Sequence, residues 1–554
     1  MPRTAPEEAK ALKLSKQALA VIQRGHLEDG KQQLVAAWHT CPKSTRVLMV
    51  CAGSLIDIGE NETALQILID AFKIAGESSE LLLLAGEIAE RLQMYDMGAK
   101  FYSRLVQLVP DKADHYAALI ECLRQSGEAN QALEIALAAI EQFPQAARLW
   151  NSLGVLSLNH LNKIDDARHF FECAVQIEPK NAVFRYNYAT AIAHHPEFTE
   201  TNLREALRLA PRNPQINLTL GLMLLADGRL EEGWKKYRFR NDPSFGYSKV
   251  AQYTHGIPFW KEGQSLAGKR VLVCAEQGIG DEVLFASAVP QLLEEAADVS
   301  ICCEPRLIGI FKQSFPSATI YGYSDERGYK GRSRNITGLD DTQAKGFDIA
   351  IYIGDLFAYY VQTYENLTRF SQAYLAHDTT LAKAVTGQFP ALGSAGRLKI
   401  GISWRSGKME NARGFYYLSL DFIKDLVKAV DADFFVLQYA ASDEELASLA
   451  EFTNVHIFEG YDLKKDIDFN LATMSRMDLV IGPATATQSF AAACGAPVWL
   501  VNLGAPWTLF GSKDMPPFYA DGSRFFDLSH YLFGGASYER LLGDMCKLLE
   551  NYHG

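Results

Sequence analysis

A carboxylate preceded by a glycine-rich turn is the group in this sequence best suited to do chemistry. Residues 270–285 read Arg-Val-Leu-Val-Cys-Ala-Glu-Gln-Gly-Ile-Gly-Asp-Glu-Val-Leu-Phe. The apolar start predicts a strand, Gly278 and Gly280 predict a sharp turn, and Asp281 opens an apolar-periodic helix. Both glycines are also candidate ligand-binding residues, because such turns lie at the carboxyl ends of strands where ligands bind. A carboxylate in that place can serve as a general base. Asp also commonly caps a helix, and the local pattern alone favours the cap.

Two polar stretches further along the chain could bind an anionic ligand. The first, residues 403–408, reads Ser-Trp-Arg-Ser-Gly-Lys and directly follows a predicted strand. It offers a guanidinium, an ammonium, hydroxyls and a flexible backbone to a phosphate or diphosphate. The candidate ligand-binding residues in it are Ser403, Arg405, Ser406, Gly407 and Lys408. An ordinary polar loop between a strand and a helix explains the same residues equally well.

The second stretch, residues 481–489, reads Ile-Gly-Pro-Ala-Thr-Ala-Thr-Gln-Ser and runs into a predicted helix. Backbone N–H groups at the start of a helix attract anions. Beside them stand the side chains of Thr485, Thr487, Gln488 and Ser489. The alternative is that one of the two threonines only caps this helix. Gln438 ends a neighbouring predicted strand, and it either reads a base or ribose or satisfies backbone groups.

A framework of alternating strands and helices has to position these groups. Such a series begins near residue 269, and it restarts after Pro390. Two successive series predict two Rossmann-like lobes, residues 269–395 and 396–554, which face each other across a cleft. Between its strands the first lobe has a predicted loop at residues 324–346. The final amphipathic helix, residues 538–552, is predicted to pack back on the first lobe.

The N-terminal half shows a repeat with a period near 34 residues. Prolines recur at Pro42, Pro110, Pro144, Pro179 and Pro211, with spacings of twice 34, then 34, 35 and 32. Small residues keep the same phase. They are Gly59, Gly127 and Gly228 at predicted turns, and Ala64, Gly98, Ala132 and Gly233 where two helices meet. This pattern predicts a tetratricopeptide superhelix over residues 1–245, followed by a linker at 246–268. Such arrays usually bind a peptide or protein in their groove.

Composition narrows the class of protein. The 554-residue chain has a formal net charge of −12 and no basic tract, which argues against a nucleic-acid partner. It has neither a secretory start nor a run of 18 apolar residues, so we expect no membrane insertion. The nine cysteines lack a Cys-x-x-Cys spacing and fit reduced thiols in a cytoplasmic protein. Two Asp-x-Asp pairs, at 431–433 and 466–468, are expected to be solvated, and no metal is expected.

With these features together, the chain resembles bacterial tetratricopeptide-linked glycosyltransferases of the GT-B fold. Several segments carry the resemblance jointly: Gly233-Trp-Lys-Lys-Tyr-Arg-Phe-Arg240, Pro258-Phe-Trp260, Ala275-Glu-Gln-Gly-Ile-Gly-Asp-Glu282, Ile402-Ser-Trp-Arg-Ser-Gly407, Leu437-Gln-Tyr439, Asp478-Leu-Val-Ile481, Gly495-Ala-Pro-Val-Trp499 and Pro517-Phe-Tyr519. The catalytic half is similar to heptosyltransferases and, more distantly, to O-linked N-acetylglucosamine transferase. In heptosyltransferases a Gly-Asp after the first strand supplies the catalytic base. That match falls on Gly280-Asp281 and reverses the preference for a helix cap.

One departure from the heptosyltransferase pattern bears on the donor. Those enzymes carry an acidic residue and a histidine in the donor loop, and here Ala484 and Ser489 stand in those places. This argues against an ADP-heptose donor. The Pro-Ala-Thr-Ala-Thr-Gln form looks more like the branch that glycosylates flagellin. In that branch the donor is often a CMP-activated nonulosonic acid such as pseudaminic acid.

The resemblance implies an inverting, metal-independent glycosyltransferase that needs no cofactor besides its nucleotide-sugar co-substrate. The array would hold a protein acceptor, flagellin being the candidate, and Asp281 would deprotonate a Ser or Thr hydroxyl. Two alternatives stay open. The chain could be a tetratricopeptide adaptor whose α/β half has lost activity, or a heptosyltransferase-like enzyme acting on a lipid-linked glycan.

Overall fold

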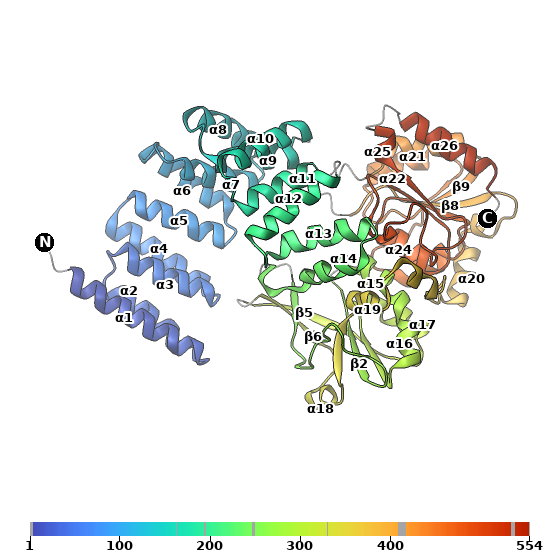
Figure 1. Cartoon of the computed structure of the whole chain (residues 1–554), viewed down its shortest axis with the longest axis horizontal. Helices are drawn as coiled ribbons and strands as arrows, with labels where there is room; N and C mark the ends of the chain where they lie inside the picture. Colours follow the sequence, from blue (N-terminus) through green and yellow to red (C-terminus); the bar gives the residue numbers. More distant parts are fainter. Residues whose placement is uncertain are drawn as a thin grey trace. The chain divides into compact units, whose positions relative to one another are not determined.

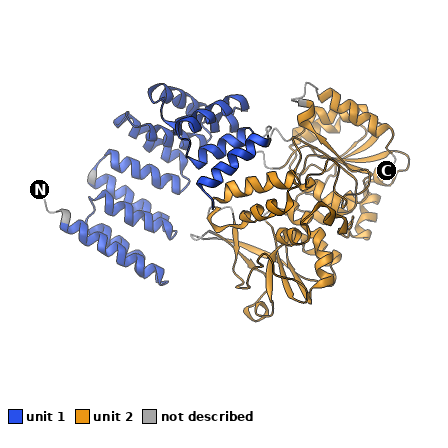
Figure 2. Cartoon of the chain, in the orientation of Figure 1, with its two compact units in different colours: residues 1–212, 327–331 blue, residues 213–326, 332–554 orange. Residues whose placement is uncertain are grey.

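The computed structural model describes residues 4–161, 163–192, 196–245, 250–276, 278–328, 331–407, 417–532 and 538–552. The chain forms two compact units (Figure 2). The first comprises Met1–Arg212 together with Arg327–Gly331, and the second comprises Asn213–Glu326 and Arg332–Gly554. Among the described residues, every helix is too short or too polar to cross a lipid bilayer.

The first unit is a stack of helices in which each packs on the next in sequence (Figure 1). Their bounds are α1 (Thr4–Gln23), α2 (Leu27–Thr40), α3 (Thr45–Asp57), α4 (Asn61–Ala75), α5 (Ser79–Arg91), α6 (Tyr95–Leu108), α7 (Ala113–Gln125), α8 (Ala129–Gln142), α9 (Ala147–Asn159), α10 (Ile164–Ile177), α11 (Ala182–Ala191) and α12 (Pro196–Leu209). Small residues allow this packing. A Cβ added at Gly86 would lie 2.5 Å from the Tyr102 ring, and one at Gly154 would lie 2.5 Å from the Phe171 ring. The prediction of a tetratricopeptide-like helical array is confirmed.

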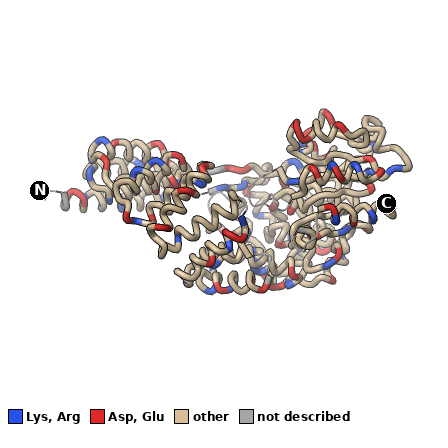
Figure 3. The backbone as a smooth tube through the Cα atoms, turned by 90° about the horizontal axis from the view of Figure 1, so that it is seen from above, with Lys and Arg blue, Asp and Glu red and all other residues tan. Residues whose placement is uncertain are grey.

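The predicted turn glycines also have the expected conformation. Gly59, Gly127 and Gly228 have φ values of 84°, 91° and 76°, in the left-handed region that residues with a Cβ rarely adopt. Each lies in the short turn between one helix and the next, so the period in the sequence marks real helix boundaries. Basic and acidic residues are interspersed along both units (Figure 3).

The second unit opens with helices that continue the repeat pattern. They are α13 (Pro214–Ala226) and α14 (Leu230–Tyr237), followed by the short turns η1 (Arg238–Asn241) and η2 (Pro243–Phe245). Trp234 of α14 is buried in the core of this unit. Its indole Nε1–H donates to the Val361 carbonyl over 2.6 Å, and its ring packs on Phe357 and Phe510. The last repeat helix is therefore part of the hydrophobic core of the α/β unit.

The first lobe has a parallel sheet with strand order β4-β3-β2-β7. The strands are β2 (Arg270–Cys274), β3 (Asp298–Cys302), β4 (Thr319–Tyr321) and β7 (Ile349–Tyr352). The helical elements are α15 (Ile279–Phe285), η3 (Ala286–Ala288), α16 (Val289–Glu295), η4 (Pro305–Leu307), α17 (Ile308–Ser314) and α19 (Ile353–Tyr360). Phe259, from the predicted linker, forms a bridge with Ala350 at the edge of this sheet. The connection to the second lobe contains η5 (Tyr364–Arg369), α20 (Thr379–Gln388) and η6 (Pro390–Gly393).

The second lobe has a six-stranded parallel sheet with order β10-β9-β8-β11-β12-β13. Its strands are β8 (Leu398–Ile402), β9 (Ala432–Val436), β10 (Val455–His456), β11 (Leu479–Gly482), β12 (Val498–Asn502) and β13 (Arg524–Asp527). Its helical elements are α21 (Leu420–Ala429), α22 (Asp443–Ala450), α23 (Ile467–Met474), α24 (Ala486–Ala493), η8 (Trp507–Leu509), α25 (Leu528–Leu532) and α26 (Tyr538–Glu550). Counted from its first strand, this order is 3-2-1-4-5-6, and that of the first lobe is 3-2-1-4. These are the orders of doubly wound nucleotide-binding sheets, in which ligands bind beyond the carboxyl ends of strands 1 and 4.

Two expectations about the fold are wrong. Residues 324–346, predicted as a loop, contain the strands β5 (Tyr323–Gly328) and β6 (Gly331–Ile336) and the short helix α18 (Asp341–Ala344). Strand β6 pairs in parallel with β1 (Ala251–Tyr253), so the order of this small sheet is β1-β6-β5. The charged side chains that made this segment look like a loop are paired: the buried Arg334 donates to Asp325 and stacks over the Tyr323 ring.

The second wrong expectation concerns the C-terminal helix. Helix α26 packs on α21 of its own lobe, where Leu541, Met545 and Leu549 join the core beneath the sheet. Its apolar stripe predicts burial but does not say against which surface, because either lobe could supply an apolar partner.

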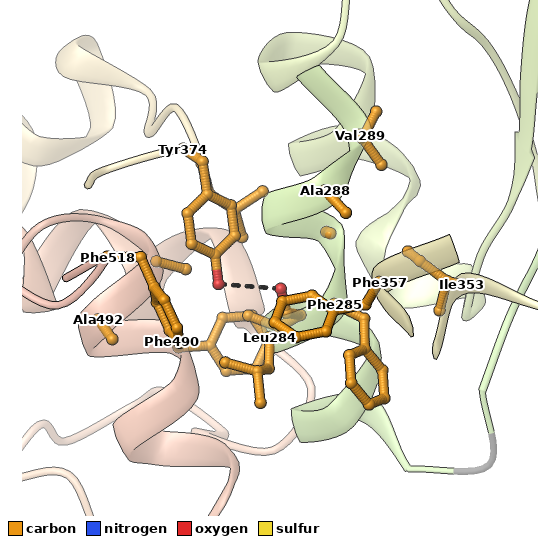
Figure 4. Close-up of a cluster of buried hydrophobic side chains, with 14 of the residues drawn as sticks. Leu284, Phe285, Ala288, Val289, Ile353, Phe357, Tyr374, Phe490, Ala492 and Phe518 are labelled. Carbon is orange, nitrogen blue, oxygen red and sulfur yellow. Dashed lines mark hydrogen bonds between the residues drawn. The ribbon is translucent and has the colours of Figure 1, made fainter. Parts of the chain in front are cut away.

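The two lobes share one hydrophobic cluster (Figure 4). Leu284 and Phe285 of α15 meet Phe490 of α24 there, with Phe357 of α19 beside them. Tyr374, in the segment connecting the lobes, donates its hydroxyl to the Val283 carbonyl over 3.0 Å. Helices α15 and α24 therefore pack against each other, which brings together the segments that begin directly after β2 and after β11.

Candidate active site

Asp281 lies in the first turn of α15, directly after the carboxyl end of β2. The N-cap residue of this helix is Gly278, not Asp281, and no side chain caps it by a hydrogen bond. A Cβ built on Gly278 would lie 3.0 Å from Asp281 Oδ2, so the carboxylate folds back over the turn. The helix-cap alternative for Asp281 is therefore not what the structure has. The glycine in front of it provides space for the carboxylate.

Gly280 lies at a close contact between the two lobes. A Cβ at Gly280 would lie 3.0 Å from Ala486 Cα and 3.3 Å from Ala486 Cβ, at the first residue of α24. The glycine thus permits a direct approach of two helix starts, and this requirement exists without any ligand. It also puts Asp281 next to the N-terminal turn of α24.

Gly280→Ala is expected to weaken this lobe contact. Because the added methyl group meets backbone atoms, the helices must move apart, and overpacking of this kind costs about 1–3 kcal/mol. We expect a lower melting temperature for the α/β unit. Gly387→Ala is a matched control, since Gly387 has no neighbouring atom within 4 Å of an added Cβ. Equal melting temperatures for the two variants would contradict the close contact.

Asp281 combines access to solvent with a dense protein surrounding. Its side chain is exposed, although protein atoms surround it densely enough to disfavour its charged form. Desolvation, followed by the nearby negative charge of Glu276, raises the pKa of Asp281 to about 6, while the positive charge of Arg240 acts in the opposite direction. An accessible carboxyl with a pKa just below neutrality is suited to general-base catalysis, because it is ionised at pH 7 and still basic enough to accept a proton.

A buried ionic network lies beside this carboxyl. The Arg240 guanidinium donates to both Glu276 oxygens, at 2.6 and 3.2 Å, and to Asp355 Oδ1 at 2.8 Å. The Gly354 N–H also donates to Glu276 Oε1 over 3.0 Å. The sequence pattern alone assigns no role to Arg240, Glu276 or Asp355. The available signal was the position of Glu276 directly after a predicted strand, one turn before Asp281.

Tyr237 of α14 is a further neighbour to which the sequence pattern gives no role. Its ring is buried against Phe285 and Trp507, with the Arg240 guanidinium 4.4 Å from the ring centroid. Burial raises the pKa of the Tyr237 hydroxyl, and the Asp281 carboxylate adds to that rise. The end of the repeat pattern thus supplies an arginine and a tyrosine to the surroundings of Asp281.

Gln438 has a structural role in the second lobe. Its side-chain oxygen accepts from the N–H groups of Trp404 and Arg405, each over 2.9 Å. Its amide nitrogen donates to the carbonyls of Arg405 and Tyr439. The side chain is buried, and these four bonds use its whole capacity. The sequence left two roles open for Gln438, and the structure has the second, in which the side chain satisfies backbone groups. Gln438 thereby shapes the loop after β8.

Arg405 is engaged within the protein. Its guanidinium donates through Nε and Nη2 to the two oxygens of Glu445, and also to the Ala440 carbonyl. Although partial burial acts in the opposite direction, the hydrogen bonds from Arg405, the Ser442 N–H and the Trp404 indole lower the pKa of Glu445 to about 2. Arg405, which the sequence predicts as a phosphate-binding residue, is therefore held in a bidentate ion pair with the ionised Glu445 carboxylate.

The remaining candidates of this loop are placed as follows. Ser406 Oγ lies 3.3 Å from the Tyr439 hydroxyl oxygen, and an added Cβ at the exposed Gly407 would lie 2.6 Å from the Tyr439 ring. Lys408 lies outside the described residues. Ser403 is buried, and its hydroxyl accepts from the Gln488 amide over 2.9 Å.

The start of α24 is tied to the loop after β8. Thr485 is the N-cap residue, but its hydroxyl donates to Gln488 Oε1 over 2.8 Å and does not cap the helix. Gln488 and Thr487 are buried, whereas Thr485 and Ser489 are half-buried. The N–H groups in the first turn of a helix have no intrahelical partner, which leaves this turn electropositive. The anion site stays a prediction, and its backbone frame would be the first turn of α24, which the buried Thr487 and Gln488 hold in place.

Of the two Asp-x-Asp pairs expected to be solvated, Asp431, Asp466 and Asp468 are exposed. The expectation is wrong for Asp433, which is buried at the start of β9 beside Arg397 and His456. Arg397 donates to Asp431 and Asp433, and Asp466 accepts from the Asp462 N–H. In the part of the chain that the structure describes, no three His, Cys, Asp or Glu side chains are arranged to hold a metal ion.

Comparison with known proteins gives one relative over most of the chain. It is Protein FlbA of Caulobacter vibrioides, 29% identical over 504 residues, which cover 88% of this chain and 81% of FlbA. Residues 87–240 match a family model described as U3 small nucleolar RNA-associated protein 6 C-terminal. This segment lies within the helical repeats.

Several solved structures are similar to parts of the chain. A tetratricopeptide repeat protein from Parabacteroides merdae is 14% identical with a TM-score of 0.35, covering 43% of this chain and 94% of that one. Yeast Tom70 is 18% identical with a TM-score of 0.35, covering 42% and 50%. The thermophilic TPR protein TTC0263 of Thermus thermophilus is 19% identical with a TM-score of 0.29, covering 33% and 100%. The repeat assignment itself rests on the period and helix pairs of this chain, which joins a tetratricopeptide-like array to an α/β unit and is similar to Protein FlbA over most of its length.

Proposed function

We propose that this protein is an inverting, metal-independent glycosyltransferase of the GT-B fold. It would move a sugar from a nucleotide-sugar donor to a Ser or Thr hydroxyl of a protein acceptor. The observation that carries the proposal is the placement of an accessible carboxylate, Asp281, beside the N-terminal turn of α24 where two doubly wound lobes meet. One lobe supplies a base and the other an electropositive helix start.

The chemistry follows from this pairing. Asp281 takes the proton of the acceptor hydroxyl as that oxygen forms a bond to the anomeric carbon of the donor. The bond between this carbon and the phosphate oxygen breaks, and the phosphate leaves with the electron pair. Peptide N–H groups of Ala486 and Thr487 stabilise the charge that develops on it. Attack opposite to the leaving group inverts the configuration at the anomeric carbon.

Partners are assigned by the resemblance and by the architecture. The tetratricopeptide-like array is proposed to hold the acceptor protein, with flagellin as the candidate acceptor. The donor is proposed to be a CMP-activated nonulosonic acid, since Ala484 and Ser489 stand where an ADP-heptose enzyme would carry an acid and a histidine. The proposal includes no nucleic acid, no membrane insertion and no resident cofactor, and it places the protein in the cytoplasm.

Incubation of the purified chain with flagellin and a CMP-nonulosonic acid tests this function. Intact-mass spectrometry should show flagellin gaining the mass of one or more sugars, with equimolar CMP released. A panel of UDP-, GDP- and ADP-sugars serves as the donor control. Unchanged flagellin mass with every donor would reject transfer to this acceptor.

An inactive adaptor is the second candidate, and a specific observation favours it. Arg405 and Gln438, which could have contacted a nucleotide, are both committed to bonds within the second lobe. Thermal-shift measurements separate the two candidates. A transferase should be stabilised by its nucleotide by about 2.7 kcal/mol at a concentration 100 times the Kd. The adaptor predicts no shift with CMP, UDP, GDP or ADP.

A further inference from the structure

We propose that Arg240, together with Glu276 and Asp355, forms a positioning network that holds the turn carrying Asp281 and sets the electrostatic field at that carboxyl. This inference rests on the proposed role of Asp281 as the base. None of the three residues is proposed to touch the substrate. They act through the placement and charge state of Asp281.

The positioning part of the argument comes from where the network is attached. Glu276 follows β2 at the start of the turn, and Asp355 lies in α19, which follows the adjacent strand β7. Arg240 joins the two through four hydrogen bonds of 2.6 to 3.2 Å. The network therefore clamps the carboxyl ends of strands 1 and 4 of the lobe, between which ligands of doubly wound sheets bind.

Its packing leaves little freedom for these groups. Arg240 is 7% exposed and Glu276 is 3% exposed, so protein groups and not water surround their charged ends. A Cβ at Gly354 would lie 2.6 Å from Glu276 Oε1 and 2.8 Å from Arg240 Nη2. The glycine at this point gives the ion pair the space that it occupies. A pair of this kind, once buried, keeps a single geometry because breaking it would leave an unpaired charge.

The electrostatic part follows from the charges on each element around Asp281. The turn contributes Glu276, α19 contributes Asp355, and η1 contributes Arg240. Of helix α14, Tyr237 is the residue whose hydroxyl interacts with Asp281, and the first turn of α24 has no ionisable side chain. On α15 the adjacent Glu282 is buried and accepts from the Glu304 N–H. Strand β6 contributes Arg334, which donates to the Glu276 carbonyl over 2.9 Å and pairs with Asp325. Of these groups, Arg240 is the cation that favours ionisation of Asp281, and Glu276 is the anion that opposes it.

Two substitutions in the full-length protein test this inference by moving the pH–rate profile in opposite directions. Arg240→Met removes the offsetting cation, so the acid limb of kcat/KM should move to higher pH by about one unit or more. Glu276→Gln removes the opposing anion, so the limb should move to lower pH. Arg240→Lys keeps the charge and should restore most of the wild-type profile. Arg238→Met changes the same charge two residues away, where Arg238 pairs with the exposed Glu262, and should leave the profile in place.

A network that only stabilises the fold would give a different result. It would lower activity by the same factor at every pH, without moving the limb, and that outcome would overturn the inference. A shift in the same direction for both substitutions would also overturn it. If Arg240→Met does not fold, because it leaves the buried Glu276 and the partly buried Asp355 without their cation, the downward shift in Glu276→Gln remains decisive.

A second readout separates this inference from the proposed function. The difference in melting temperature between the wild type and Asp281→Asn, followed against pH, reports the ionisation of Asp281 without any transfer. The pH midpoint of this difference should be lower when both proteins also carry Glu276→Gln. If the midpoint moves down but no sugar is transferred, the proposed transferase function is rejected and the network is retained. Active enzyme whose midpoint does not move would reject the network alone.

Discussion

Asp281→Asn should retain the fold and lose sugar transfer by about 10²–10⁴-fold, the contribution typical of a positioned general base. Asparagine keeps the size of the side chain but cannot accept the acceptor proton. The first turn of α15 tolerates it, because the Asp281 side chain does not cap the helix. The measurement is kcat/KM for flagellin modification, with circular dichroism and acceptor binding recorded on the same preparation.

The neighbouring carboxyl provides a matched control. Glu282 is buried, and burial raises its pKa to about 8, so it is mostly protonated at neutral pH. Glu282→Gln therefore replaces a neutral group with a neutral group of similar shape. We expect this variant to keep activity within a few-fold of wild type. Full activity in Asp281→Asn would remove the proposed base.

The pKa of Asp281 also predicts a pH dependence of both activity and stability. The base form is present above a pKa of about 6, so wild-type kcat/KM should fall tenfold per pH unit below that value. The folded pKa lies above the ordinary value of 3.8, which means that the fold prefers the protonated form. The favourable contribution of Asp281 to stability is therefore greatest below pH 4 and is lost as the pH rises to 6. At pH 8 Asp281→Asn should melt at least as high as the wild type.

Trp234→Ala is the substitution with the largest expected effect on stability. Trp234 is 1% exposed and packs on Tyr237, Phe357 and Phe510. Removing a buried tryptophan costs about 3–5 kcal/mol through lost burial and the cavity that remains. The Val361 carbonyl also loses its indole donor, which adds about 1–3 kcal/mol if no water replaces it.

Chemical unfolding of the full-length protein, followed by circular dichroism, measures this effect. We expect the transition of the α/β unit to move to markedly lower denaturant concentration, while that of the helical array changes little. Trp260→Ala is the comparison, since Trp260 is half-buried and its indole donates to the nearby Gln264 carbonyl. Similar losses of unfolding free energy in the two variants would contradict the central place of Trp234 in the core.

The role of Trp234 also bears on how the repeat pattern meets the α/β part. Helix α14 completes the last sequence repeat, yet its aromatic face belongs to the core of the second unit. It ends at Tyr237 and continues into η1 with Arg240, and both residues interact with Asp281. A substitution in this helix is therefore expected to affect the candidate base, Asp281, as well as the stability of the unit.

The sequence alone determined the features that depend on short-range patterns. The period of prolines and small residues predicted the helical array, because each helix pair repeats the same local packing. The apolar run, glycine turn and apolar-periodic segment around Asp281 predicted a strand, a turn and a helix where β2 and α15 lie. The start of α24 after β11 was predicted in the same way.

Only the tertiary structure decided which side chains meet. By sequence, Arg405 is a candidate to bind a phosphate. In the fold its guanidinium lies against Glu445, 40 residues away. Gly280 could have been a ligand-binding glycine until Ala486 was seen to lie against it. The network of Arg240 and Asp355, separated by 115 residues, and the pairing of β1 with β6 have the same origin. Charged side chains carry no periodic signal for a distant partner, since their pairing depends on how the sheet and helices bring remote segments together.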